Sequence, residues 1–189
     1  MRSLILILSF LIFTGSTIKA QEFVYFGAKG GINLTDLSSD NFAKTSFRTG
    51  FHLGLLAEVP LSNKISIQPE ILYSTQGTEA DVITFEGNLN IDYNLNYFQV
   101  PVLAKIYLTE SLSIEAGPSF NFLVKEKIWD RKTEFGSSFE FGGALGVSYA
   151  ISNGFFITTR YSYGFTNALD AYSTTFNNSG FQLGTGFMF

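Results

Sequence analysis

Large apolar residues alternate with small or polar residues along most of this chain. The clearest run is residues 47–59, where every second position from Phe47 to Val59 is Phe, Thr, Leu, Ala or Val. A period of two is typical of a β-strand with one apolar face. The same pattern predicts eight strands, at residues 23–33, 47–59, 65–76, 91–108, 112–122, 138–150, 155–165 and 179–189.

Long and short connections alternate between these strands. The four long loops are at residues 34–46, 77–90, 125–137 and 166–178, with three short turns between them. The last strand has neither lysine nor proline, so both of its edges need a partner, and a closed barrel pairs every edge. An even strand count with this asymmetry is typical of outer-membrane barrels with tight periplasmic turns. We therefore expect an all-β fold, an eight-stranded antiparallel up-and-down transmembrane β-barrel in the outer membrane with both termini in the periplasm.

The N-terminus has the layout of a secretory signal peptide. Arg2 precedes an apolar run at residues 4–13, small and polar residues follow at 14–17, and cleavage is expected after Ala20, although Ile18 stands where a small residue is usual. That run is too short to cross a bilayer as a helix, and no later segment reaches the roughly eighteen apolar residues that such a helix needs. We expect a signal peptide at residues 1–20 and one barrel domain at residues 21–189.

The composition of the chain argues against some classes of partner and some kinds of site. The chain has 189 residues, a formal net charge of -4 and no cysteine. This length fits one domain. A nucleic-acid partner would require a clustered basic face, and the absence of cysteine excludes disulfides and thiolate metal sites.

The faces opposite the apolar ones carry eight charged residues, four of each sign. The positive residues are Lys29, Arg48, Lys105 and Arg160, and the negative ones are Glu58, Glu70, Glu115 and Glu140. An eight-stranded barrel is just wide enough to be filled by side chains, and buried charges need partners. We predict a structural charge network that plugs the lumen, with glycines on the same faces leaving room for it. A proton or ion path through these residues is the alternative.

Prolines and aromatic residues give two further expectations. Pro69, Pro101 and Pro118 fall inside predicted strands, where each removes a ladder donor, so we expect bulges or local breaks there. Aromatic residues near strand ends fit girdles at the two membrane interfaces, although β-propensity explains some of them equally well. These residues are Phe47, Tyr73, Tyr97, Tyr107, Tyr149, Phe155 and Tyr163.

The sequence offers few residues that are suited to catalysis or metal binding. His52 is the only histidine, and its phase turns it inward beside Arg48, which favours a hydrogen-bonding role in the lumen. A single histidine without cysteine does not make a transition-metal site. The acidic pair Asp36 and Asp40 lacks the ligand spacing of a calcium loop. We predict no catalytic, cofactor-binding or metal-binding residue.

Several motifs resemble a known family over residues 23–189. They are residues 27–33 (GAKGGIN), 68–73 (QPEILY), 98–105 (FQVPVLAK), 116–118 (AGP), 160–164 (RYSYG) and the final aromatic strand. The sequence resembles the PorT-like outer-membrane β-barrel proteins, small barrels of the wider OmpA/OmpX-like superfamily. The resemblance implies an eight-stranded outer-membrane barrel. In Phe187 and Phe189 it implies a C-terminal signal for the barrel-insertion machinery, but fold alone does not transfer an activity.

The leading interpretation is a non-enzymatic, monomeric barrel whose outside loops make its contacts. Its expected partners are outer-membrane lipids, the insertion machinery during biogenesis, and an extracellular or secretion-system protein, but no nucleic acid. Two alternatives remain. One is a lipid-modifying enzyme on the same barrel, and the other is a soluble lipocalin-like binder with its apolar face turned inward.

Overall fold

A computed structural model describes residues 24–38, 45–84, 87–128, 131–133, 136–152, 154–168 and 176–189. The predicted signal peptide at residues 1–20 lies outside this part of the chain. Within the described ranges, no helix has the length and apolarity that a helical bilayer crossing requires.

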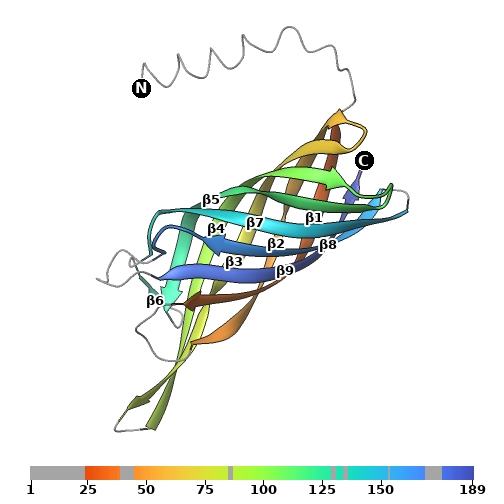
Figure 1. The fold of residues 1–189 in the computed structure, drawn as a ribbon. Helices are drawn as coiled ribbons and strands as arrows, with labels where there is room; N and C mark the ends of the chain where they lie inside the picture. The colour runs from red at the N-terminus through yellow and green to blue at the C-terminus, as the bar shows by residue number, and fades with distance from the viewer. Residues whose placement is uncertain are drawn as a thin grey trace, which may run out of the picture.

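Nine strands follow one another along the chain (Figure 1). They are β1 (Tyr25–Ser38), β2 (Thr45–Ser62), β3 (Ile65–Thr84), β4 (Gly87–Tyr107), β5 (Leu112–Ile128), β6 (Arg131–Lys132), β7 (Phe139–Ser152), β8 (Phe155–Gly164) and β9 (Asn177–Met188). The sheet order is β4-β3-β2-β1-β9-β8-β7-β5, and pairing of β4 with β5 closes it. The two residues of β6 pair only with the end of β5. The predicted all-β fold, a closed barrel of eight antiparallel strands, is confirmed.

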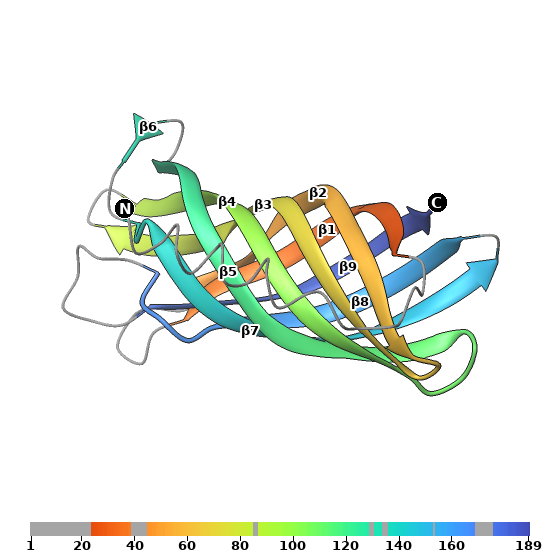
Figure 2. The same cartoon turned by 90° about the horizontal axis from the view of Figure 1, so that it is seen from above.

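The two ends of the barrel differ (Figure 2). One end, here called the turn end, carries the short connections β2–β3, β4–β5 and β7–β8 together with the start of β1 and the C-terminus. In the β7–β8 turn, Gly154 has a φ of +88°, which favours glycine. The opposite end, the loop end, carries β6, the end of β3 at Thr84 and the start of β4 at Gly87.

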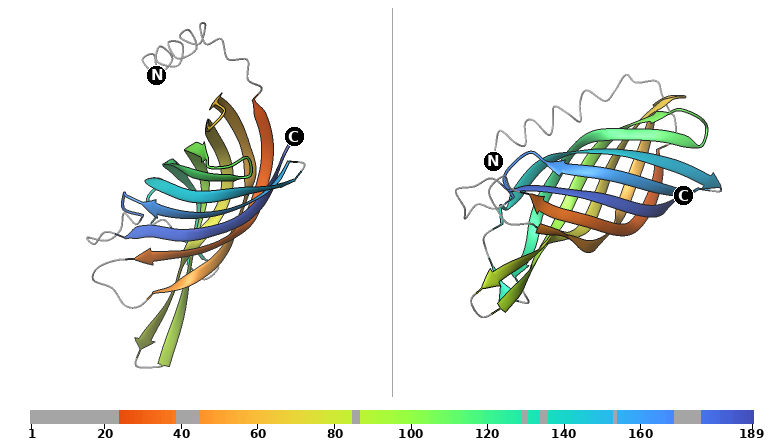
Figure 3. Two further views of the ribbon diagram at one scale, coloured as in Figure 1. Left: turned by 45° about the vertical axis from the view of Figure 1, so that its right-hand side comes forward. Right: turned by 60° about the horizontal axis from the view of Figure 1, so that its bottom comes forward.

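The predicted long loop at residues 77–90 is wrong. β3 continues to Thr84 and β4 starts at Gly87, and the two pair without interruption from Gly77↔Asn94 to Thr84↔Gly87. The hairpin extends past the last β2 and β5 partners, so it projects from the barrel (Figure 3). The loops predicted at residues 34–46 and 125–137 are also partly strand, because β1 runs to Ser38 and β5 to Ile128. A strand that extends beyond the apolar outer wall does not need an apolar residue at every second position. The pattern that located the other strands is therefore missing there.

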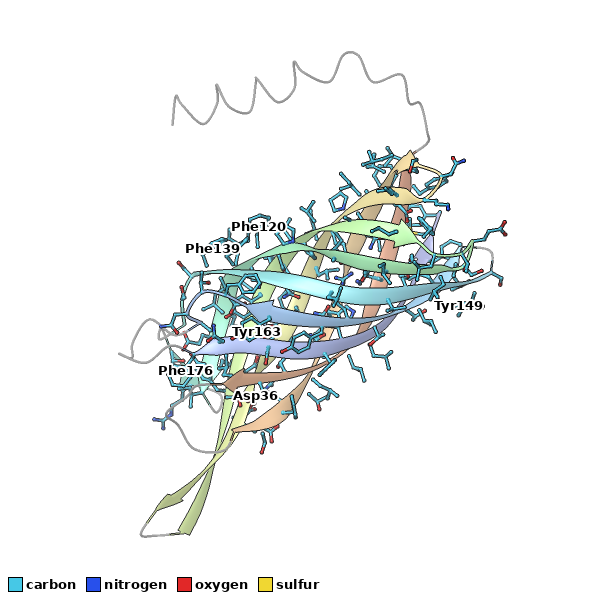
Figure 4. All side chains as sticks on the ribbon, in the orientation of Figure 1. Asp36, Phe120, Phe139, Tyr149, Tyr163 and Phe176 are labelled. Carbon is cyan, nitrogen blue, oxygen red and sulfur yellow. The ribbon has the colours of Figure 1, made fainter. Side chains whose placement is uncertain are left out.

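Apolar side chains cover the outside of the wall. Leu53 is 62% exposed and Ile157 is 46% exposed, and both lie on the outer face, whereas the charged residues of the same strands point inward. Figure 4 shows the same arrangement for Phe139 near the loop end and Tyr149 near the turn end. A lipocalin-like barrel has the reverse arrangement, so the soluble alternative does not fit.

The three strand prolines do not shift the register. The β2–β3 ladder keeps one register on both sides of Pro69, and the β3–β4 and β4–β5 ladders do the same around Pro101. Pro118 pairs with Gly143 in an uninterrupted β5–β7 register. Bulges are therefore wrong at these positions, but the expected local breaks are present. Each proline belongs to a gap of two pairs in one ladder: Pro69 in the β2–β3 ladder, Pro101 in the β3–β4 ladder and Pro118 in the β4–β5 ladder. The register shifts lie instead between Phe47 and His52, Pro60 and Ser62, Asn96 and Tyr97, and Ala150 and Ser152.

Candidate functional site

Four charged side chains form a layer across the middle of the lumen. Lys29 comes from β1, Glu70 from β3, Glu115 from β5 and Arg160 from β8. In the closed strand order these are every second strand, so the four side chains approach one another from four sides of the barrel. None of them is more than 3% exposed. We call this set the ionic layer.

Arg160 is the centre of the ionic layer. Its Nη1 and Nη2 donate to the Glu70 Oε2 and Oε1 at 2.9 and 2.8 Å. Its Nε and Nη2 also donate to the Glu115 Oε1 at 2.9 and 2.6 Å. Lys29 Nζ lies 3.1 Å from Glu70 Oε2. Charge-assisted, bidentate bonds of this kind fix side-chain geometry, which offsets part of the cost of burying the charges.

Glycines on neighbouring strands make room for the ionic layer. Gly146 on β7 lies between Glu115 and Arg160 in the sheet, and a Cβ there would lie 2.9 Å from Glu115 Oε1. Lys29 is flanked in the same way by Gly54 on β2 and Gly186 on β9. The large charged residues therefore depend on the missing side chains of the intervening strands.

A second ion pair lies toward the turn end. Lys105 Nζ donates to Glu58 Oε2 at 2.9 Å, and the Tyr107 hydroxyl donates to Glu58 Oε1. Gln68 connects this pair to the ionic layer, because its Oε1 accepts from Lys105 at 3.3 Å and its Nε2 donates to Glu70 at 2.7 Å. Three positive and three negative residues thus form one connected network, and its charges balance.

The other two predicted network residues lie elsewhere. Arg48 pairs with Asp92 at 2.7 Å near the loop end, where the Asp92 side chain is 47% exposed. Glu140 is buried, but among the described residues no cation lies within ion-pairing distance of it. Its Oε1 accepts from Asn121 Nδ2 at 2.9 Å, and its Oε2 has no hydrogen-bond partner. Neither residue joins the ionic layer.

His52 is buried between the ionic layer and the loop end. Its Nδ1 lies 2.7 Å from Asn33 Oδ1, and within the described part of the chain its Nε2 has no hydrogen-bond partner. The ring lies over Gly31 and Gly184, where a Cβ would approach it to 2.9 Å. The expected neighbour, Arg48, is not its partner. This environment supplies a hydrogen bond to a neutral amide and no carboxylate.

Amide side chains fill the lumen beyond His52. Gln182 donates to Gln99, Gln99 donates to Asn121, and Asn178 donates to Gln76 at 2.5 Å. The cavity among these amides and Glu140 measures about 10 Å³, which is room for about one water molecule.

An apolar cap closes the loop end of the lumen. It consists of Leu37, Tyr93, Leu95, Tyr97, Ala168 and Phe176, with Leu123 and Ile128 packed against it. The prediction that Tyr97 belongs to an interfacial girdle is wrong, because the residue is 0% exposed in the lumen. Tyr107 is also turned toward the lumen, because its hydroxyl donates to Glu58. The sequence does contain a signal for these residues. Tyr93, Leu95 and Tyr97 alternate along β4 in step with Gln99, so they lie on the same inward face.

The remaining predicted residues lie at the C-terminus. Phe187 is on the outer face of β9, with its ring 4.8 Å from the ring of Phe155. Phe189 is held only by its backbone, whose N–H donates to the Phe26 carbonyl at 2.8 Å, and its side chain is 72% exposed. Among the described residues, no group of three His, Cys, Asp or Glu side chains could hold a metal ion.

Comparisons with known proteins agree with this architecture. The family described as outer membrane protein beta-barrel domain matches residues 19–170. No curated protein sequence matches the chain.

Solved structures show the same fold at low sequence identity. Neisserial surface protein A (NspA) is 14% identical, with a TM-score of 0.59 over 88% of this chain and 97% of that one. Ail, the attachment invasion locus protein of Yersinia pestis, is 17% identical, with a TM-score of 0.52 over 87% and 98%. OprG from Pseudomonas aeruginosa is 14% identical, with a TM-score of 0.51 over 87% and 95%.

Proposed function

This chain belongs to the outer membrane protein β-barrel family, and from that premise we propose that it is a non-enzymatic, monomeric barrel whose lumen is closed and whose loop end binds a partner. The observation that carries the proposal is the ionic layer. Its side chains meet from four alternate strands, so they occupy the cross-section through which a solute would pass. The apolar cap adds a second closure at the loop end.

Electrical recording tests the closed lumen. Purified protein is added to a planar lipid bilayer, with an open porin as the positive control. The proposal predicts no stepwise conductance while insertion is verified independently. Steady, ohmic current steps from the wild-type protein would contradict it and would favour the ion path instead.

The environment of His52 supports the non-enzymatic part of the proposal. A lipid-modifying enzyme would need a nucleophile, a histidine and a carboxylate together near the rim. Here the imidazole contacts the Asn33 amide inside the lumen. A His52→Asn variant should leave the lipid composition of the outer membrane unchanged. An altered lipid profile in that variant would favour the enzyme.

We place both termini and the three short turns in the periplasm, and the loop end outside the cell. Outer-membrane barrels commonly have this asymmetry. The chain has no cysteine, so single cysteines report orientation cleanly. A membrane-impermeant maleimide should label Arg131→Cys in β6 on intact cells. It should label Glu110→Cys, in the β4–β5 turn, only after the outer membrane is permeabilised, and the reverse result would invert the topology.

The partner at the loop end is proposed to be an extracellular or secretion-system protein. The projecting β3–β4 hairpin and the neighbouring β6 form its accessible surface (Figure 1). The sequence motifs also support a place in the PorT-like branch of the family. Photo-crosslinking from position 131 in native membranes tests the proposal, with position 110 as the control. Crosslinks from position 110 alone would contradict it.

A further inference from the structure

The lumen contains one buried carboxylate that no cation of the described chain neutralises. Glu140 on β7 is 2% exposed. The lumenal cations Lys29, Lys105 and Arg160 are each paired with a carboxylate of the connected network, whose charges already balance. Burial of an unpaired carboxylate is unfavourable, so the charge of Glu140 needs a partner from outside the network.

Two oxygens near this charge have no hydrogen-bond partner within the described residues. They are Glu140 Oε2 and Asn178 Oδ1, and both residues line the cavity of about 10 Å³. Asn178 is 4% exposed, and its amide nitrogen donates to Gln76. The amide nitrogen of Asn121 donates to the other carboxylate oxygen, Glu140 Oε1. The two unpartnered atoms are therefore acceptors, and what they require is a positive or hydrogen-donating group.

The rest of the cavity lining adds oxygen ligands and space. Gln76 and Gln99 each have a side-chain oxygen that accepts one hydrogen bond and keeps a second lone pair. Gly142 and Gly164 also line the cavity, and a Cβ at position 164 would lie 2.9 Å from Glu140 Oε1. Carboxylate and amide oxygens are the ligands that hard cations take in proteins.

We propose that this cavity binds one small monovalent cation, with Glu140 Oε2 and Asn178 Oδ1 among its ligands. Such an ion neutralises the carboxylate and occupies both acceptors, whereas a water molecule would leave the charge uncompensated. A divalent ion would exceed the single negative charge. A proton shared by the two oxygens would bring them into contact, but both residues line a space that admits a sphere the size of a water molecule.

The sequence predicts no metal-binding residue, and the proposed site shows why it would be overlooked. It combines a single carboxylate with neutral amides from other strands, so it has no cluster of acidic residues, histidine or cysteine. The site goes beyond the proposed function and does not depend on a partner at the loop end.

Sodium-dependent stability tests the proposal. The complete barrel is refolded in non-ionic micelles, because the ionic layer and the apolar cap lie on either side of the cavity and the ion would enter during folding. Sodium chloride replaces choline chloride at constant ionic strength, and urea unfolding is measured. An ion that binds only the folded state acts by mass action. Once the site is saturated, each further tenfold rise in sodium should raise the folded-to-unfolded ratio about tenfold.

Two glutamine variants provide a matched comparison. Glu140→Gln should lose the sodium dependence, and in sodium-free buffer it should be at least as stable as the wild type. Glu126→Gln removes another buried carboxylate, which accepts from the Tyr93 and Thr133 hydroxyls and does not line the cavity. This variant should keep the sodium dependence. If Glu140→Gln does not fold, Asn178→Ala replaces it and should weaken the dependence.

Carbon NMR of the glutamate carboxyl groups separates an ion from a proton. In sodium, the Glu140 carboxyl carbon should have the chemical shift of an ionised carboxylate. The shift of a neutral acid would overturn the proposal. Equal stability of the wild type in sodium and choline would also overturn it and assign the cavity to water. A sodium dependence that persists in Glu140→Gln would place the ion elsewhere and equally contradict the site.

Discussion

Arg160 on β8 and Glu70 on β3 form a bidentate ion pair between strands on opposite sides of the barrel. Both bonds are shorter than 3.0 Å, and ninety residues separate the two positions in the sequence. In the closed strand order, three strands lie between β3 and β8 in either direction. The pair therefore spans the lumen and ties the two halves of the wall together.

Removing the cation of this pair should destabilise the barrel strongly. Arg160→Met leaves the Glu70 and Glu115 carboxylates buried with too few partners, and breaking a buried pair in this way costs about 3–5 kcal/mol. The free energy of unfolding in urea, measured on protein refolded in micelles, checks this. Arg48→Met is the matched control, because its pair with Asp92 is partly exposed and such pairs contribute about 1 kcal/mol or less. Equal losses in the two variants would contradict a special role for the ionic layer.

The two buried glutamates should respond in opposite ways to loss of charge. Glu140→Gln should keep or raise the free energy of unfolding, because Glu140 is buried without a cation. The new amide can also donate to the unpartnered Oδ1 of Asn178, which lines the same cavity. Glu115→Gln should lose about 2 kcal/mol, since it removes charged acceptors from Arg160. Urea titration of both variants makes the comparison, and a larger loss in Glu140→Gln would show that the assignment of Glu140 is wrong.

A larger side chain beside the ionic layer should lower the free energy of unfolding of the barrel. Gly146→Val places a Cβ 2.8 Å from the Thr159 carbonyl oxygen and 2.9 Å from Glu115 Oε1, and overpacking of this kind costs about 1–3 kcal/mol. Gly30→Val is the control on the outer wall, where valine suits a strand and the change should stay below about 1 kcal/mol. Thermal or urea unfolding measures both. A Gly146→Val barrel as stable as the wild type would mean that the lumen is loosely packed.

The C-terminal residue should matter more for assembly than for stability. Phe189 has an exposed side chain, so Phe189→Ala should change the unfolding free energy by no more than about 0.5 kcal/mol. If Phe187 and Phe189 signal to the insertion machinery, the same variant should assemble more slowly in cells. The heat-modifiable, folded fraction in outer-membrane preparations measures this. Normal assembly of a Phe187→Ala, Phe189→Ala double variant would contradict the signal.

The sequence sufficed for the wall and for the inward face. Period-two alternation located all eight barrel strands and predicted which charged residues point inward, because each strand has one apolar and one polar face. The alternation does not show which of the charged side chains contact one another across the lumen. Lys29 and Arg48 have the same inward phase, yet only Lys29 reaches Glu70, since contact across a lumen depends on strand stagger, which alternation does not encode.

Two other features were hidden for physical reasons. The β3–β4 hairpin beyond Gly77, where φ is +134°, has no apolar band to face, so the sequence there is typical of a loop. Tyr97 is of a residue type common in aromatic girdles. Only its position, two residues before the inward-facing Gln99, identifies it as lumenal. To predict the apolar cap from the sequence, the inward and outward positions of the strands must be followed beyond the apolar part of the wall.

The most direct test of the central claim, an apolar wall facing lipid around a polar lumen, is quenching by acyl-chain nitroxides. The chain has one tryptophan, Trp129, so single-tryptophan variants can be built in a Trp129→Phe background. In vesicles containing doxyl-labelled lipid, Phe51→Trp and Tyr161→Trp should be strongly quenched, whereas Tyr97→Trp should be protected. Strong quenching at position 97 with protection at positions 51 and 161 would contradict the account.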